Sequence, residues 1–156
     1  MEQTMIQPEW RKVAEVELVY KTKVKASERP QVKTSHDGYN ILHQIWNKDR
    51  IEMQEEFKVL LMNRSNKVIG VFEAGSGGIT GTVADPRLIL AAALKSLATA
   101  IILAHNHPSG NLKPSTADEN LTSKIKEAAK FHDITVLDHL IITSEGYFSF
   151  ADEGLL

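Results

Sequence analysis

The sequence predicts an α/β fold in which helices lie on both faces of a mixed β-sheet. Strand-like and helix-like patterns alternate along the chain, two neighbouring strand patterns are joined by a short turn, and no repeat or low-complexity tract separates them. The chain has 156 residues, of which 42% are hydrophobic, and this length suits one domain with a sizeable core. The alternation therefore predicts a three-layer αβα sandwich.

The first half of the chain predicts an opening strand, a helix and a hairpin. Apolar side chains alternate along residues 16–20, which is the period of a strand. Residues 39–47 place their apolar side chains at helical spacing. Two more strand patterns follow at residues 57–62 and 67–72, joined by the turn-forming tetrad Asn63-Arg64-Ser65-Asn66.

The second half predicts helices between strands. Asp85-Pro86 matches the cap and first position of a helix, and residues 88–98 are apolar nearly all round. We expect that helix to be buried against the sheet. A strand pattern at residues 100–104 follows directly, and residues 134–143 and 147–150 predict the last two strands.

Residues 104–118, AHNHPSGNLKPSTAD, contain a candidate metal site. His105 and His107 lie two apart at the end of an apolar strand, so both side chains should point to the same face and Asn106 to the other. Asp118 precedes apolar residues and one histidine at helical spacing: Leu121, Ile125, Ala128 and His132. This spacing places Asp118 on the inward stripe of a helix, an unusual position for an unpaired carboxylate.

Two imidazoles and one carboxylate are the ligand set of a hydrolytic zinc site, whose fourth position is open. The sequence thus predicts one Zn²⁺ per chain, held by His105, His107 and Asp118. An alternative is that Ser115 and Asp118 form a helix capping box. Thr116 and Glu119 offer a competing cap in the next register, so capping does not require Ser115 and Asp118.

The complete pattern resembles the motif of the JAMM (MPN-plus) metalloproteases, because His-x-His-Pro is followed after six residues by Ser and after two more by Asp. The segments HNHPSG, LDHLIIT and YFSF resemble more closely the RadC family of JAMM-domain proteins, from about residue 10 to the C-terminus. The chain looks like a short form without the N-terminal helix-hairpin-helix module of many RadC proteins.

The resemblance implies a three-layer fold of the JAMM and cytidine-deaminase-like type. Residues 35–156 would form the RadC-like JAMM (MPN) domain. Residues 1–34 would supply an N-terminal strand and a basic edge segment of the same domain.

The resemblance also implies an upstream glutamate that activates water, and Glu55 and Glu56 are the candidates. In a strand, Glu55 shares the apolar face of Phe57 and Val59, whereas Glu56 shares a face with Lys58. The RadC pattern of Glu, one residue, then Phe also favours Glu55. The archaeal JAMM pattern of Glu directly before Phe favours Glu56, and a third interpretation is that both glutamates are solvated.

We therefore expect a zinc-dependent hydrolase of a peptide or isopeptide bond in a peptide or protein substrate. Zinc lowers the pKa of bound water towards ~7, Glu55 takes the proton and returns it to the leaving amine, and Ser115 with zinc stabilises the oxyanion. Two alternatives are a DNA repair or recombination factor, as the RadC family label states, and a non-catalytic MPN interaction module, although such modules typically lose the ligands.

Composition bears on the alternatives. The net charge of −2 is not that of a typical DNA-binding domain, and a basic cluster is interpreted as a solvated edge: Lys21, Lys23, Lys25, Arg29 and Lys33. DNA is a possible partner that the charge does not favour. The sequence has no cysteine, which excludes a zinc deaminase, and no membrane-length apolar run or leader, so we expect a cytoplasmic protein.

The remaining histidines separate into two groups. Asp138 and His139 close a strand pattern, where they would either orient a metal ligand or form a hydrogen-bonded core pair. His36, His43 and His132 are expected at the surface or at helix ends.

Overall fold

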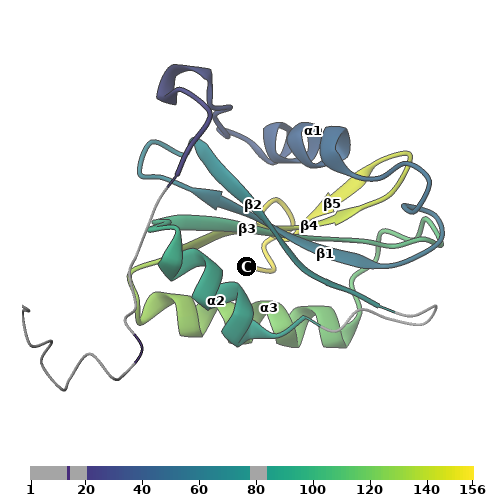
Figure 1. The fold of residues 1–156 in the computed structure, drawn as a ribbon. Coiled ribbons are helices and arrows are strands. Elements are labelled where there is room, and N and C mark those ends of the chain that lie inside the picture. The colour runs from purple at the N-terminus through teal and green to yellow at the C-terminus, as the bar shows by residue number, and fades with distance from the viewer. Residues whose placement is uncertain (1–13, 15–20, 78–83) are drawn as a thin grey trace, which may run out of the picture.

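The computed structural model describes residue 14 and residues 21–77 and 84–156 (Figure 1). In chain order they form η2 (Ala26–Glu28), α1 (Ser35–Ile45), β1 (Glu56–Met62), β2 (Val68–Ser76), α2 (Pro86–Lys95), β3 (Ala100–Asn106), α3 (Thr116–Lys130), β4 (Thr135–Ile142) and β5 (Tyr147–Ser149). The expected strand at residues 16–20 lies outside the described residues.

The strands in the described part of the chain form one five-stranded sheet in the order β2-β1-β3-β4-β5. Among these described strands only β3 and β4 run parallel, and the helix α3 supplies the crossover that a parallel pair requires. Figure 1 shows α1 on one face of the sheet and α2 with α3 on the other. The predicted mixed sheet and the three-layer αβα architecture are confirmed.

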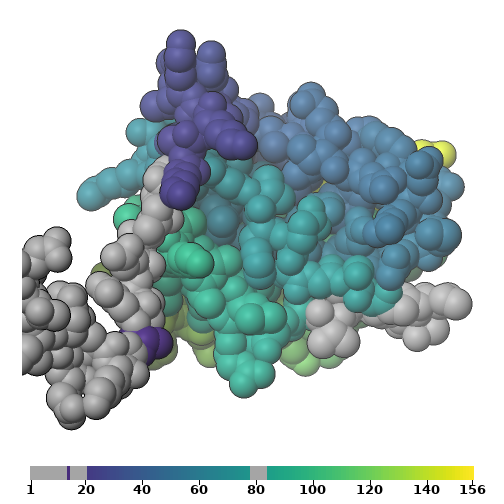
Figure 2. Space-filling model, in the orientation of Figure 1, coloured from purple at the N-terminus to yellow at the C-terminus, as the bar shows by residue number. Residues whose placement is uncertain are grey.

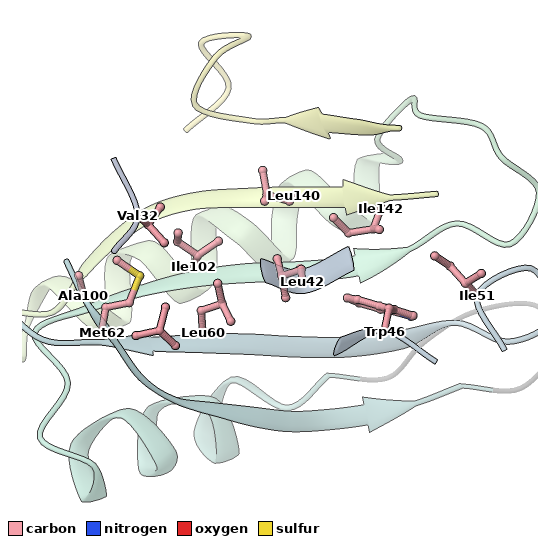
Figure 3. Packing of buried hydrophobic residues seen from close by; sticks show 12 residues of the cluster. Val32, Leu42, Trp46, Ile51, Leu60, Met62, Ala100, Ile102, Leu140 and Ile142 are labelled. Atoms are coloured by element: carbon pink, nitrogen blue, oxygen red, sulfur yellow. The ribbon is translucent and has the colours of Figure 1, made fainter. Parts of the chain in front are cut away.

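Two apolar clusters hold these layers together. The cluster on the α1 face (Figure 3) comprises Val32, Leu42, Trp46, Ile51, Leu60, Met62, Val68, Ala100, Ile102, Ala104, Leu140 and Ile142. The cluster beneath α2 and α3 comprises Phe57, Val59, Leu61, Ile89, Ala93, Ala98, Ile101, Leu103, Ile125, Ala129, Ile134 and Val136. Every residue of β1 and β3 is buried, because both faces of these strands are covered.

The first helix begins four residues earlier than expected. Thr34 caps it, since its hydroxyl accepts from the Asp37 N–H at 3.2 Å while the Asp37 carboxylate accepts from the Thr34 N–H at 3.0 Å. The helix ends at Ile45, and Trp46 is already extended, with its side chain buried. The sequence contains a signal for this helix start, namely the capping pair Thr34 and Asp37.

The helix over residues 88–98 was expected to be buried against the sheet, and the structure shows this for one side of the helix only. Within α2 only Ile89 and Ala93 are buried, whereas Leu88 is 54% exposed. A helix on the outside of a sandwich packs along one stripe, and Figure 2 shows the outer side of α2 at the surface. The helix stops at Lys95 because Leu97 adopts a left-handed φ of 57° and the Ala98 N–H returns to the Ala93 carbonyl at 2.9 Å.

The hairpin prediction is confirmed, with β2 extending four residues beyond the expected end to Ser76. Asn63 holds the turn, since its side-chain oxygen accepts from the N–H groups of Ser65 and Lys67 at 3.0 and 3.1 Å. Residues 30–32 run past this turn: Gln31 bridges to Lys67, and Val32 lies in the core. Among the described residues, no helix is long and apolar enough to cross a membrane.

Candidate metal centre

The end of β3 and the first turn of α3 bring together three side chains that could hold a metal ion. The Nε2 atoms of His105 and His107 lie 3.0 Å apart. One carboxylate oxygen of Asp118 is 3.4 Å from the His105 Nε2, and the other is 3.5 Å from the His107 Nε2. In the part of the chain that the structure describes, no other group of three His, Cys, Asp or Glu side chains converges in this way.

These distances fit a zinc ion. A tetrahedral site with bonds of about 2.0 Å has ligand atoms about 3.3 Å apart. The His107 Nδ1–H donates to the Asn111 carbonyl at 2.5 Å, which leaves the His107 Nε2 lone pair directed at the site. The structure brings His105, His107 and Asp118 together, and a tetrahedral ion held by these three groups would have one position open.

The electrostatics of the group favour an ionised carboxylate. Burial by itself raises the pKa of Asp118, but its contacts with the His105 and His107 rings and the N–H of Ser115 hold this pKa far below its usual value. Burial likewise lowers the pKa of His107, whereas Asp118, the Asn111 carbonyl and the charge of Glu55 raise it by more, so that the net shift is upward. The ionised Asp118 carboxylate therefore provides a negative charge that would attract a cation.

Capping and metal binding use the same carboxylate. Ser115 is the N-cap of α3: its hydroxyl accepts from the Asp118 N–H at 3.1 Å, and its own N–H donates to the Asp118 carboxylate at 2.8 Å. The competing box of Thr116 and Glu119 is not the cap, because the helix begins at Thr116. The two interpretations of Ser115 and Asp118 are thus compatible, and the cap orients the carboxylate.

The buried stripe of α3 is displaced by one position at two of its members relative to the predicted stripe. Its buried members are Thr122, Ile125 and Ala129, while His132 is exposed. The side chain of Asp118 is 19% exposed and lies one turn before Thr122, so it faces the sheet at the open end of this stripe.

The two upstream glutamates have different surroundings. Glu56 is buried on the α1 face, 3.5 Å from both Lys58 and Arg50, so it is not the solvated residue of the third interpretation. Glu55 precedes β1, is half-buried, and stands beside Phe57, which pairs with His105 across the two strands. Its charge acts on His107. The role of Glu55 as base stays a prediction.

Asn106 is a residue whose contacts the sequence did not reveal. Its side chain points to the α1 face, as expected from strand phase, and is completely buried. The amide oxygen accepts from the Glu56 N–H at 2.7 Å, and the amide nitrogen donates to the carbonyls of Ile51 and Gln54 at 2.8 and 2.9 Å. These three bonds tie the segment that carries Glu55 to the strand that carries both histidines.

Asp138 and His139 are neighbours in the chain but have different roles in the structure. The Asp138 carboxylate accepts from Ser149 at 2.6 Å and from the Ala151 N–H at 3.0 Å, and burial raises its pKa. It therefore fixes the turn after β5. The His139 ring instead contacts the metal group, because its Nε2 is 2.8 Å from the His105 Nδ1. Burial holds the pKa of His139 well below its usual value.

The other three histidines lie away from the site. His36 and His132 are exposed and His43 is half-buried near the end of α1, as expected.

A groove of about 520 Å³ adjoins His107. The loop after β3 and the turn between β4 and β5 form its sides, and Glu52 and Glu145 carry the charges of its lining. The Ser144 hydroxyl donates to the Glu52 carboxylate at 2.7 Å, and this bond links the β4–β5 turn to the segment before β1.

Comparison with known proteins shows the family to which the chain belongs. The family model described as a RadC-like JAB domain matches residues 32–155. This chain belongs to the RadC family. The match begins at Val32, the first residue of the segment that packs into the core, and includes every residue of the metal group.

Several relatives of this RadC-family chain are named only as UPF0758 proteins. One from Flavobacterium johnsoniae is 46% identical over 125 residues, covering 80% of this chain and 53% of that protein. One from Porphyromonas gingivalis is 53% identical over 104 residues, covering 66% and 46%. The Escherichia coli protein YfjY is 43% identical over 103 residues, covering 66% and 64%. The chain spans about half the length of the first two relatives.

Proposed function

We propose that this RadC-family domain is a zinc-dependent hydrolase that cleaves a peptide or isopeptide bond. The observation that carries the proposal is the convergence of His105, His107 and Asp118, with donor atoms 3.0–3.5 Å apart. A structural zinc site takes four protein ligands, whereas a catalytic site takes three and leaves one position open. The groove beside His107 provides access to the site.

A zinc ion bound by these residues supplies Lewis acidity, which lowers the pKa of water and polarises a carbonyl group. Glu55 accepts the proton of the attacking water and returns it to the leaving amine. Ser115 donates its hydroxyl proton to the oxyanion of the tetrahedral intermediate. The Ser115 oxygen accepts from the Asp118 N–H, and a hydroxyl that accepts one hydrogen bond can still donate another.

The charges around the centre favour a polypeptide over DNA. The described lining of the groove contains Glu52 and Glu145 but no lysine or arginine, so a phosphate backbone would find no cation there. The basic segment at residues 21–25 is exposed at the far end of the sheet, where the β1–β2 turn lies (Figures 1 and 2). The basic segment therefore does not form a continuous nucleic-acid-binding surface with the metal centre.

The experiment is a screen of zinc-loaded protein against a library of peptides and isopeptide-linked peptides, with Glu55→Gln as the inactive comparison. We expect cleavage by the wild type and its loss in Glu55→Gln, while a substitution on the exposed side of α3, Glu127→Gln, leaves cleavage unchanged. Zinc-loaded wild-type protein that cleaves nothing in the library, or a Glu55→Gln variant that cleaves as well as wild type, would contradict the proposal.

A further inference from the structure

We infer that His139 is a positioning residue of the proposed metal centre, because it closes a hydrogen-bonded loop that joins two of the three metal-binding residues. The loop runs from His105 through His139 and Thr122 to Asp118. It fixes the tautomer of His105 and the distance between β3 and α3. The inference rests on the proposed centre but concerns metal binding, which is measured independently of hydrolysis.

The directions of the hydrogen bonds follow from one fixed end. The Thr122 hydroxyl donates to the Asp118 backbone carbonyl at 2.6 Å, and a carbonyl can only accept. The Thr122 oxygen is 2.5 Å from the His139 Nδ1. Since the hydroxyl proton is already committed, this oxygen accepts, and the proton of the neutral His139 ring is on Nδ1.

The same reasoning then extends to His105. With its proton on Nδ1, His139 has a lone pair on Nε2, which lies 2.8 Å from the His105 Nδ1. His105 must donate there, so its own proton is on Nδ1 and its Nε2 lone pair is free. That lone pair points to the metal group, where the Asp118 carboxylate is 3.4 Å away. Each proton in the loop thus directs a ligand atom towards the metal.

Packing keeps the His139 ring in this orientation. His139 is completely buried, and His105 and Thr122 are 3% and 2% exposed, so water has little access to the three bonds. The ring stacks on Phe150 with centroids 4.7 Å apart and lies 5.5 Å from the centroid of Phe57. Rotation of the imidazole would break both hydrogen bonds and this stacking.

The alternative is that His139 only fills space in an aromatic core. A phenylalanine or leucine would fill that space without the cost of burying two ring nitrogens. His139 instead has a partner at each nitrogen, and both partners lead to metal-binding residues. Hydrogen-bond partners of metal-ligating histidines typically change metal affinity about 10–100-fold when they are removed.

The experiment measures zinc affinity by competition with a chromophoric chelator in the full chain. His139→Phe keeps the aromatic packing but cannot accept from His105, and we expect it to bind zinc about 10–100-fold more weakly than wild type. His139→Gln, whose amide oxygen can accept that bond, should retain more of the affinity. Thermal unfolding of the metal-free variants and the absorption spectrum of the cobalt-substituted proteins monitor the fold and the coordination geometry.

A second matched pair tests the other end of the loop. Thr122→Val preserves the shape of the side chain and removes the hydroxyl, so zinc should bind more weakly, whereas Thr122→Ser should bind as wild type does. Unchanged zinc affinity in both His139→Phe and Thr122→Val would overturn the inference while the metal centre stands. A wild-type protein that binds no zinc would overturn both.

Discussion

The carboxylate of Asp118 has two tasks, and its ionisation suits both. It accepts the N–H of Ser115 at the start of α3 and lies 3.4–3.5 Å from the two imidazoles. An anion in the first turn also interacts favourably with the helix dipole. The cap therefore fixes the orientation of the oxygen that we propose as a metal ligand, and few side-chain torsions would need to be ordered on binding.

Ser115→Ala should affect both tasks of this turn. Loss of the cap is expected to lower the free energy of unfolding by about 1 kcal/mol, and loss of the oxyanion donor to lower kcat by about 10²–10³-fold. Thr116→Ala is the matched control, since Thr116 is exposed and is not the cap. Chemical denaturation and kcat values check these expectations, and equal effects of the two substitutions would show that Ser115 has no special role.

The two neighbouring glutamates should respond differently to the same change. Glu55→Gln is expected to keep the zinc and abolish hydrolysis, because the amide cannot take a proton from water. Glu56→Gln should keep hydrolysis and reduce stability by about 1–3 kcal/mol, since it leaves the buried Lys58 with one carboxylate fewer. Zinc content, turnover and denaturation of both variants decide the matter. The reversed pattern of activities would identify Glu56 as the base.

Between elements, the contacts of Asn106 connect the strand β3 to the segment before β1. Each of its three hydrogen bonds ends on a backbone group between Ile51 and Glu56. The side chain is buried, so water cannot replace those bonds at low cost. We expect this contact to hold Glu55 at a constant distance from the metal-binding histidines.

Asn106→Ala should therefore loosen the segment at residues 51–56 without removing a metal ligand. The expected result is faster amide hydrogen exchange in that segment and a lower kcat, with zinc still bound. Stability should also fall by about 1–3 kcal/mol, because the Glu56 N–H loses its acceptor. Wild-type exchange rates in residues 51–56, together with a wild-type kcat, would show that Asn106 is not needed there.

The difference in burial between two neighbouring residues of α2 gives a test of how this helix packs on the sheet. Ile89 is completely buried and Leu88 is 54% exposed, although they are neighbours with similar side chains. Ile89→Ala is expected to reduce the free energy of unfolding by about 2–5 kcal/mol, and Leu88→Ala by no more than about 0.5 kcal/mol. Urea denaturation of both variants measures the difference. Similar losses would mean that the outer side of α2 is covered in solution.

For the domain as a unit, local patterns predicted the layers, the hairpin and the convergence of His105, His107 and Asp118. These features depend on strand period, turn composition and one short motif. The extent to which α2 is buried could not be predicted, because residues 88–98 are apolar even on the sides that tertiary packing leaves exposed. The Asn106 and His139 contacts were equally hidden, since their side-chain partners lie 17 or more residues away in the chain.

The distribution of charge over the domain leads to a prediction about DNA. With a net charge of −2 and its exposed basic segment at residues 21–25 at the end of the sheet remote from the centre, the chain should bind DNA weakly at physiological salt. Substituting Lys21, Lys23 and Lys25 together should leave hydrolysis unchanged. Titration of labelled duplex and single-stranded DNA at two salt concentrations tests this. Submicromolar, salt-sensitive binding that the triple variant loses would favour the DNA role.

Metal analysis of protein purified without chelator examines the centre itself. We expect one zinc ion per chain in the wild type and none in His107→Ala, because the loss of one of three protein ligands leaves too few to retain the ion. Zinc binding should also raise the midpoint of thermal unfolding, since the ion binds only the folded arrangement of His105, His107 and Asp118. Wild-type protein without a stoichiometric metal, or a His107→Ala variant that takes up zinc as the wild type does, would contradict this.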